Sequence, residues 1–201
     1  RRLKNYWTIG KTKMNRNITI LAFVLVGFVL IHGYFSNPEK KEVVVVNQSL
    51  AARFETLSQN GNSSCSLSFK DSIPSMSDDS RLMGSCCNPM SMHRYSEQVG
   101  GLTKYSNIPE IPTDPYDINA GLAEKLLGYY DMELTPQEQE AYDYAMANSH
   151  EKGPCCCKCW RWYVYGGLGK YLIKNHGFTG EQVTQVWNLS DGCGGDSEHH
   201  H

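Results

Sequence analysis

Four of the chain's eight cysteines stand close together, at Cys155, Cys156, Cys157 and Cys159. A disulfide framework spreads its cysteines along the chain so that each bridge closes a loop, and a packed core selects for shape rather than for thiols. Adjacent thiols instead suit soft-metal binding or thiol redox chemistry, because the thiolate is both a metal ligand and a nucleophile. We therefore expect the functional site at this segment, residues 155–159.

The spacing within the segment allows more than one ligand set. Cys155, Cys157 and Cys159 form a C-x-C-x-C pattern, whose side chains point the same way if the segment is extended, while Cys156 and Cys159 form a C-x-x-C pair. A helix that starts here would favour thiolate over thiol through its N-terminal N–H groups and dipole. Three convergent thiolates suit Cu(I), and four suit Zn²⁺ or a small iron–sulfur site.

A second group of soft ligands lies upstream, in residues 86–93. Its candidates are Cys86, Cys87, Met90, Met92 and His93. Thiolate and thioether sulfur both prefer Cu(I), so a copper site would draw on this composition. Each methionine alone is equally well explained as a filler of gaps in a small core, and the histidine as a surface residue. The two cysteines have their own alternative, which is one disulfide each in an oxidising compartment.

Three interpretations of the eight cysteines remain open. The favoured one is metal binding, with Cu(I) first and zinc or another soft metal second. The second is a set of structural disulfides, for which eight cysteines allow 105 pairings. The third is thiol–disulfide exchange by Cys156 and Cys159. Mixtures of disulfides and metal-bound thiols satisfy the same count.

Four predicted helices position the cysteine segment. The first is capped by Asp117, and the second opens with the capping box Thr135–Glu138. The third begins among the cysteines and ends near His176, before Gly177. The fourth opens with a second capping box at residues 179–182. Before them, three prolines in residues 107–116 predict an extended arm laid over a surface.

The short connection between the third and fourth helices predicts that they are antiparallel neighbours. The end of the fourth helix then lies near the start of the third, which brings Cys193 toward residues 155–159. The end of the second helix, with Met146 and His150, is held at the same place by another short connection. We expect the site where these helix ends meet.

The first 35 residues differ from the rest. They carry six basic and no acidic residues, and residues 18–31 are an apolar run that extends to residue 35, about the length that crosses a bilayer. Basic residues before such a run place the N-terminus in the cytoplasm and the remainder outside. A small-x-small cleavage pattern does not follow it, so an uncleaved single-pass anchor is favoured over a signal peptide.

The remaining chain divides into three parts. Residues 36–80 are rich in Ser and Asn and predict a flexible linker, with a short strand or stem at Val43–Val46 and with Cys65 alone inside it. Residues 81–196 form the predicted Cys-rich domain, and 197–201 a tail. From residue 36 onward, 13 basic and 21 acidic residues give a net charge of about −8. This acidity argues against nucleic-acid binding.

The motif Pro154-Cys155-Cys156-Cys157-Lys158-Cys159 resembles that of the PCYCGC-containing exported proteins and lipoproteins of bacteria. The resemblance covers about residues 130–195. It implies metal binding outside the cytoplasm with Cys155, Cys157 and Cys159 as ligands. Cys156 and Lys158 replace the Tyr and Gly of that motif, so an extra thiol is present here. The anchor stands where the lipoproteins have a lipid.

The sequence therefore predicts an all-α domain of about four helices with a Pro-rich arm, preceded by a transmembrane helix and a linker. Its predicted role is to sequester or deliver a soft metal on the periplasmic or extracellular side of the membrane, with a metal-handling or redox protein as partner. Motifs of hydrolases, metalloproteases and nucleotide-binding proteins are absent from the sequence, which favours a binding protein over an enzyme.

Overall fold

The computed structural model describes residues 38–195, with side chains from Gln48 onward. Its contacts divide the chain into two units after Asn47, and helix α2 (Pro38–Gln59) begins in the first of them. The predicted membrane anchor and the tail lie outside the described residues. Within residues 38–195, no helix is both long and apolar enough to span a bilayer.

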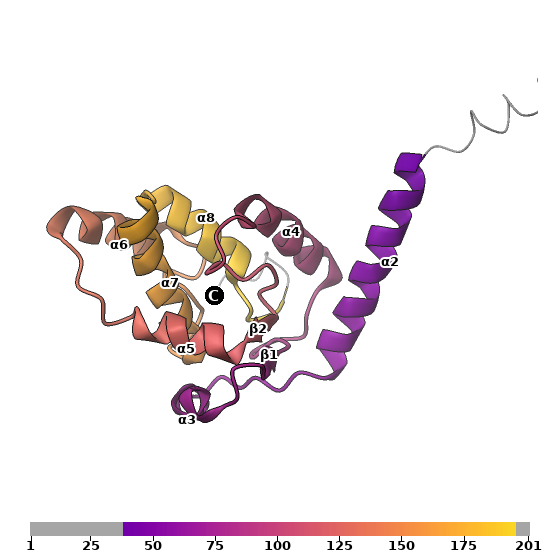
Figure 1. Ribbon diagram of the computed structural model, residues 1–201, viewed down its shortest axis with the longest axis horizontal. Coiled ribbons are helices and arrows are strands. Elements are labelled where there is room, and N and C mark those ends of the chain that lie inside the picture. The colour runs from indigo at the N-terminus through magenta and orange to yellow at the C-terminus, as the bar shows by residue number, and fades with distance from the viewer. Residues whose placement is uncertain (1–37, 196–201) are drawn as a thin grey trace, which may run out of the picture. The chain divides into compact units, whose positions relative to one another are not determined.

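The domain is mostly helical, as predicted (Figure 1). Its α-helices are α2 (Pro38–Gln59), α3 (Leu67–Ser72), α4 (Met92–Leu102), α5 (Ala120–Gly128), α6 (Pro136–Asn148), α7 (Trp160–His176) and α8 (Gly180–Ser190). Two 3₁₀ turns are η1 (Ile73–Ser75) and η2 (Thr103–Tyr105). The strands β1 (Arg81–Met83) and β2 (Asp117–Asn119) pair antiparallel, with Leu82 opposite Ile118.

The ends of α6, α7 and α8 follow the local signals in the sequence. Thr135 and Glu138 form the predicted capping box of α6, and Thr179 and Gln182 form that of α8. Helix α7 ends at Gly177, which has a φ of 63° and so adopts the left-handed conformation that glycine tolerates best. These three helices are confirmed.

Helix α7 lies at the centre of the core. Its buried residues contact α5, α6 and α8, and the large ones include Trp160, Val164, Leu168 and Leu172. A Cβ atom on Gly167 would overlap with the carbonyl oxygen of Leu126 in α5. Gly167 therefore permits close packing of α7 against α5.

The start of the first predicted helix was placed too early. Asp117 and Ile118 lie in β2, and Asn119 is the N-cap of α5, where its side chain accepts a hydrogen bond from the backbone N–H of Leu122. A three-residue strand is too short to show an alternating pattern, so it could not be predicted from the residue pattern.

The segment expected to be a flexible linker contains regular structure. Helix α2 includes Val43–Val46, so the expected strand there is wrong. Helix α3 follows, and Ile73 in η1 is buried in the main core. The Pro-rich arm, residues 107–116, packs on the domain as predicted, but it runs through consecutive turns rather than fully extended.

Candidate metal centre

All eight cysteines lie in one group, which we call the sulfur cluster: Cys65, Cys86, Cys87, Cys155, Cys156, Cys157, Cys159 and Cys193. All are free thiols. Their sulfurs come from the loop before α3, the loop after β1, the loop before α7 and the segment after α8. The Sγ–Sγ distance is 2.8 Å for Cys65–Cys87 and also 2.8 Å for Cys156–Cys193. Sulfur atoms this close, from distant parts of the chain, form a single soft-ligand site.

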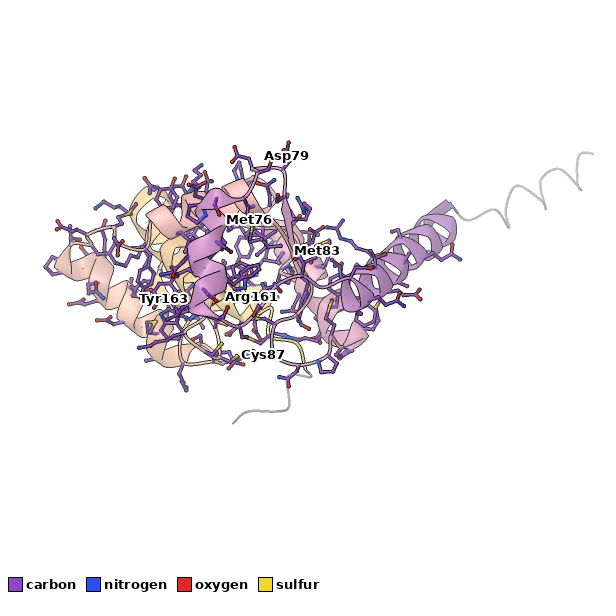
Figure 2. All side chains as sticks on the ribbon, turned by 90° about the horizontal axis from the view of Figure 1, so that it is seen from below. Met76, Asp79, Met83, Cys87, Arg161 and Tyr163 are labelled. Atoms are coloured by element: carbon purple, nitrogen blue, oxygen red, sulfur yellow. The ribbon has the colours of Figure 1, made fainter. Side chains whose placement is uncertain are left out.

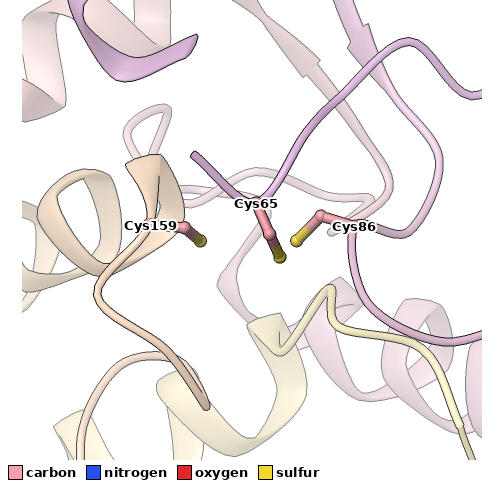
Figure 3. A group of neighbouring side chains, drawn as sticks. All are labelled: Cys65, Cys86 and Cys159. Atoms are coloured by element: carbon pink, nitrogen blue, oxygen red, sulfur yellow. The ribbon is translucent and has the colours of Figure 1, made fainter. Parts of the chain in front are cut away.

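Four triads within the sulfur cluster could each hold a metal ion, because their three sulfurs lie within 4.8 Å of one another. They are Cys65–Cys86–Cys159, Cys65–Cys87–Cys157, Cys86–Cys87–Cys193 and Cys155–Cys156–Cys157. Figure 3 shows the first triad, in which the three sulfurs converge from separate segments and Cys159 stands at the start of α7. Tetrahedral thiolates around Zn²⁺ lie about 3.8 Å apart. The Cys65–Cys157 distance of 3.7 Å matches this spacing, and the Cys65–Cys87 distance of 2.8 Å is shorter.

The loop that carries residues 155–159 is held by Ser149 at the end of α6. The Ser149 hydroxyl donates to the carbonyl oxygen of Gly153 at 2.9 Å and accepts from the Gly153 N–H at 2.8 Å. Cys159 is the N-cap of α7, and the loop is therefore fixed at both ends. The expectation that three helix ends meet at the cysteines is confirmed for α6, α7 and α8.

Backbone hydrogen bonds join the segment after α8 to the loop after β1. The N–H groups of Cys87 and Asn88 donate to the carbonyl oxygen of Cys193, at 3.3 and 2.8 Å. Gly194, with a φ of 80°, lies so close to this loop that a Cβ atom would overlap with the Asn88 carbonyl oxygen. Cys155 Sγ then lies 3.2 Å from Cys193 Sγ, which confirms the expected approach of Cys193 to residues 155–159.

Sequence reasoning did not assign Cys65 to the site. The side chain of Asn62 positions its loop, since Nδ2 donates to the Arg81 carbonyl oxygen at 2.8 Å and Oδ1 accepts from the Met83 N–H at 2.8 Å. These two hydrogen bonds attach the loop to β1, and Cys65 Sγ lies 3.7 Å from Cys157 Sγ. The even number of cysteines was the one signal in the sequence, because seven had already been assigned.

The sulfur cluster has a buried end and an exposed end. Cys155, Cys159 and Cys193 are 1%, 2% and 3% exposed. Cys65, Cys87 and Cys156 are exposed. In Figure 2, Cys87 lies at the lower edge of the domain, with Arg161 above it in the interior. A metal ion or a partner's ligand can therefore reach the cluster from the side of Cys87.

Hydrogen bonds from neighbouring thiols lower the pKa of three cysteines. The thiols of Cys159 and Cys193 hold the pKa of Cys86 far below its ordinary value, and Cys193 lowers the pKa of Cys87 to about 6. Several neighbours lower the pKa of Cys155 in the same way. The pKa is raised, chiefly by the interaction with Cys155, at Cys156, Cys157, Cys159 and Cys193. The lowered pKa values thus belong to Cys86, Cys87 and Cys155, and not to Cys159, the N-cap of α7.

A fully buried cation, Arg161, stands in the first turn of α7 beside the sulfur cluster. Its side chain donates to the carbonyl oxygens of Pro115 at 2.6 Å and Gly84 at 2.9 Å, and it lies over the Trp160 ring. No carboxylate forms an ion pair with it in the described part of the chain. Burial disfavours its charge, yet its pKa is raised by the charges of Tyr165 and of thiols in the cluster.

The structure does not bring the other upstream candidates into the sulfur cluster. Met90 and Met92 pack in a separate small core with Leu57 and Tyr95. The His93 side chain is 84% exposed, and its Nε2 lies 3.3 Å from Glu97. Because α4 begins at Met92, it directs this part of the chain away from Cys86 and Cys87.

Two further expectations concern residues near the site. Met146 packs at the edge of the main core, and the backbone N–H of His150 donates to the side chain of Asn188 at 2.9 Å. His150 belongs to none of the four triads. The two cysteines of the C-x-x-C pair considered for redox chemistry, Cys156 and Cys159, contact different sulfurs. Cys156 Sγ lies 2.8 Å from Cys193 Sγ, and Cys159 Sγ lies 3.8 Å from Cys155 Sγ.

No protein-family model, curated protein or solved structure matches this chain. The resemblance to the PCYCGC-containing proteins stays a prediction. The geometry itself shows clustered cysteines that could hold metal, on a mostly helical domain.

Proposed function

We propose that this protein binds a soft metal through the sulfur cluster, with Cu(I) as the preferred ion, and that it sequesters or delivers this metal. The observation that carries the proposal is the convergence of all eight cysteines, from four separate segments, into sulfur triads within 4.8 Å. Packing alone does not require this arrangement. A cluster of anionic thiolates is stable when a cation is bound among them.

The donor set favours Cu(I) over harder ions. Every triad consists of cysteine alone, without histidine or carboxylate. Thiolates select Cu(I), zinc and iron–sulfur clusters, whereas oxygen ligands select calcium and magnesium. Three-sulfur groups suit Cu(I), and Zn²⁺ requires a fourth ligand. Zinc is therefore the second candidate.

The role of sequestration or delivery follows from the two ends of the sulfur cluster. Buried cysteines can hold an ion away from water, and the exposed Cys65, Cys87 and Cys156 can exchange ligands with a partner protein. We further propose that residues 18–35 anchor the domain outside the cytoplasmic membrane, as the basic residues before them suggest. The resemblance to exported PCYCGC-containing proteins supports the same placement.

The test is metal analysis of the full chain, purified in detergent without oxygen. Elemental analysis should find copper at or above one ion per chain after exposure to Cu(I), and this copper should survive competition with a weak Cu(I) chelator. Replacing Cys155, Cys157 and Cys159 together by Ser should remove most of the retained copper, because it breaks three of the four triads and leaves only Cys86–Cys87–Cys193. His93→Ala is the matched control, because His93 lies outside the sulfur cluster, and it should retain copper.

Two results would contradict the proposal. One is the absence of retained copper, zinc or iron in protein whose thiols remain reduced. The other is mass spectrometry that finds all eight cysteines paired in disulfides in native protein, since paired cysteines cannot bind metal.

A further inference from the structure

We infer that the sulfur cluster is one polynuclear centre, in which up to about four Cu(I) ions share bridging thiolates. This inference rests on the proposed function and specifies how the metal is held. It differs from a mononuclear site in stoichiometry, in metal–metal distance and in its response to single substitutions.

The first support is the overlap between the triads. Cys65, Cys86, Cys87 and Cys157 each belong to two of the four triads. Cys156 is shared in the same way, because its Sγ lies 3.6 Å from Cys87 Sγ and 2.8 Å from Cys193 Sγ, outside its own triad. Filling several triads at once therefore requires sulfurs that bridge two ions.

The second support is that every triad shares a sulfur with a neighbour. Cys65, Cys86 and Cys87 connect the first three triads in a ring, and Cys157 connects the fourth. With metal–sulfur bonds of about 2.3 Å, two ions on a shared sulfur lie less than about 4.6 Å apart. Ions in this cluster would therefore be direct neighbours, and their binding should be cooperative.

The third support is the charge of Arg161. Four Cu(I) ions on eight thiolates would leave a net charge of about −4, which is costly to hold partly buried. Arg161 is fully buried, forms no ion pair with a described carboxylate, and stands two residues after Cys159. A buried guanidinium needs a nearby anion. An anionic metal–thiolate centre provides such an anion.

The test combines native mass spectrometry with X-ray absorption on the full chain titrated with Cu(I) under anaerobic conditions. We expect species with two to four ions at substoichiometric copper, together with apo protein, and a copper–copper vector in the absorption spectrum. A limit of one ion per chain, or several ions without a copper–copper vector, would overturn the polynuclear centre and leave the proposed function standing. Failure to bind any copper would overturn both.

Cys65→Ser removes a sulfur that two triads share, at an exposed position that spares the core. It should therefore lower the maximum copper content by more than one ion and weaken the copper–copper vector. His93→Ala is the matched control, because its side chain is 84% exposed and lies outside the sulfur cluster, and it should leave both unchanged. Loss of at most one ion in Cys65→Ser would contradict the bridging role of Cys65.

Discussion

The sulfur atoms of Cys65 and Cys87 lie 2.8 Å apart, although 22 positions separate the two residues and β1 lies between them. Each also approaches the loop before α7, since Cys65 lies 3.7 Å from Cys157 and Cys87 lies 3.6 Å from Cys156. The exposed end of the sulfur cluster is thus built from three loops. Its geometry depends on how those loops are attached to the domain.

The attachment of the Cys65 loop gives the first prediction. Asn62→Ala removes both side-chain hydrogen bonds to β1, which should cost about 1–2 kcal/mol locally and release Cys65 from the cluster. In copper-loaded protein, Cys65 should then react with iodoacetamide while it stays protected in the unsubstituted chain. Peptide mapping measures this difference.

Asn60→Ala is the control for that variant. Asn60 also donates a side-chain hydrogen bond, at 2.9 Å, but to the carbonyl oxygen of Thr56 within its own helix end. It should leave Cys65 protected. Equal labelling of Cys65 in both variants would show that the contact with β1 does not position this cysteine.

Local signals explain what the sequence could predict. The capping boxes at Thr135 and Thr179 and the left-handed Gly177 are short-range features, so three helix ends were placed correctly. The approach of Cys193 to residues 155–159 then followed from the short connection between α7 and α8. This part of the site could be predicted because helices that follow one another in the sequence form it.

The rest of the site depends on pairing between distant segments. The position of Cys65 depends on the hydrogen bonds that the Asn62 side chain makes to β1. Neither β1 nor its partner strand β2 is long enough to show an alternating hydrophobic pattern in the sequence. The upstream group was also read as one unit, although helix α4 begins inside it and separates Met92 and His93 from Cys86. Composition identified soft ligands there, but only the fold shows which of them converge.

The second prediction concerns pH. Cys87 is exposed, and hydrogen bonds lower its pKa to about 6, so in metal-free protein it is a thiolate above that pH. Its alkylation rate should be high at pH 7 and fall as the pH drops through about 6. Because its folded pKa is below the unfolded value of about 9, its contribution to stability is full above about pH 9 and is lost as the pH falls from about 9 to about 6.

Cys156 is the comparison for Cys87 in the same metal-free sample. It is also exposed, but its pKa is raised, chiefly by the interaction with Cys155. It should react slowly at pH 7. Mass-resolved labelling of each cysteine from pH 5 to pH 8 separates the two, and similar pH profiles would contradict the assignment of thiolate character to Cys87.

The third prediction tests the counter-charge role of Arg161. Arg161→Met keeps much of the side-chain volume but removes the buried positive charge. The anionic metal-bound cluster should therefore lose more electrostatic stabilisation than the metal-free cluster. We expect Cu(I) affinity to fall at least about tenfold, and the gain in melting temperature on copper binding to shrink. Competition with a Cu(I) chelator and thermal unfolding measure the two effects.

The comparison of metal-free and metal-bound protein separates charge from packing at Arg161. A purely structural role would lower both melting temperatures equally and leave the gain on copper binding unchanged. Arg81→Met serves as the control, because Arg81 is a partly exposed cation that pairs with Asp117 away from the sulfur cluster. It should leave the copper affinity unchanged.

The fourth prediction concerns Gly194, which closes the segment after α8 onto the loop of Cys86 and Cys87. Its φ of 80° is unfavourable for other residues, and a Cβ atom would overlap with the Asn88 carbonyl oxygen. Gly194→Ala should therefore cost about 1–2 kcal/mol and displace Cys193 from its triad. Gly128→Ala is the control, since nothing lies within 4 Å of its Cβ position. In Gly194→Ala alone, copper should dissociate faster and Cys193 should become open to alkylation. Unchanged copper retention would show that the chain after α8 does not help to hold the metal.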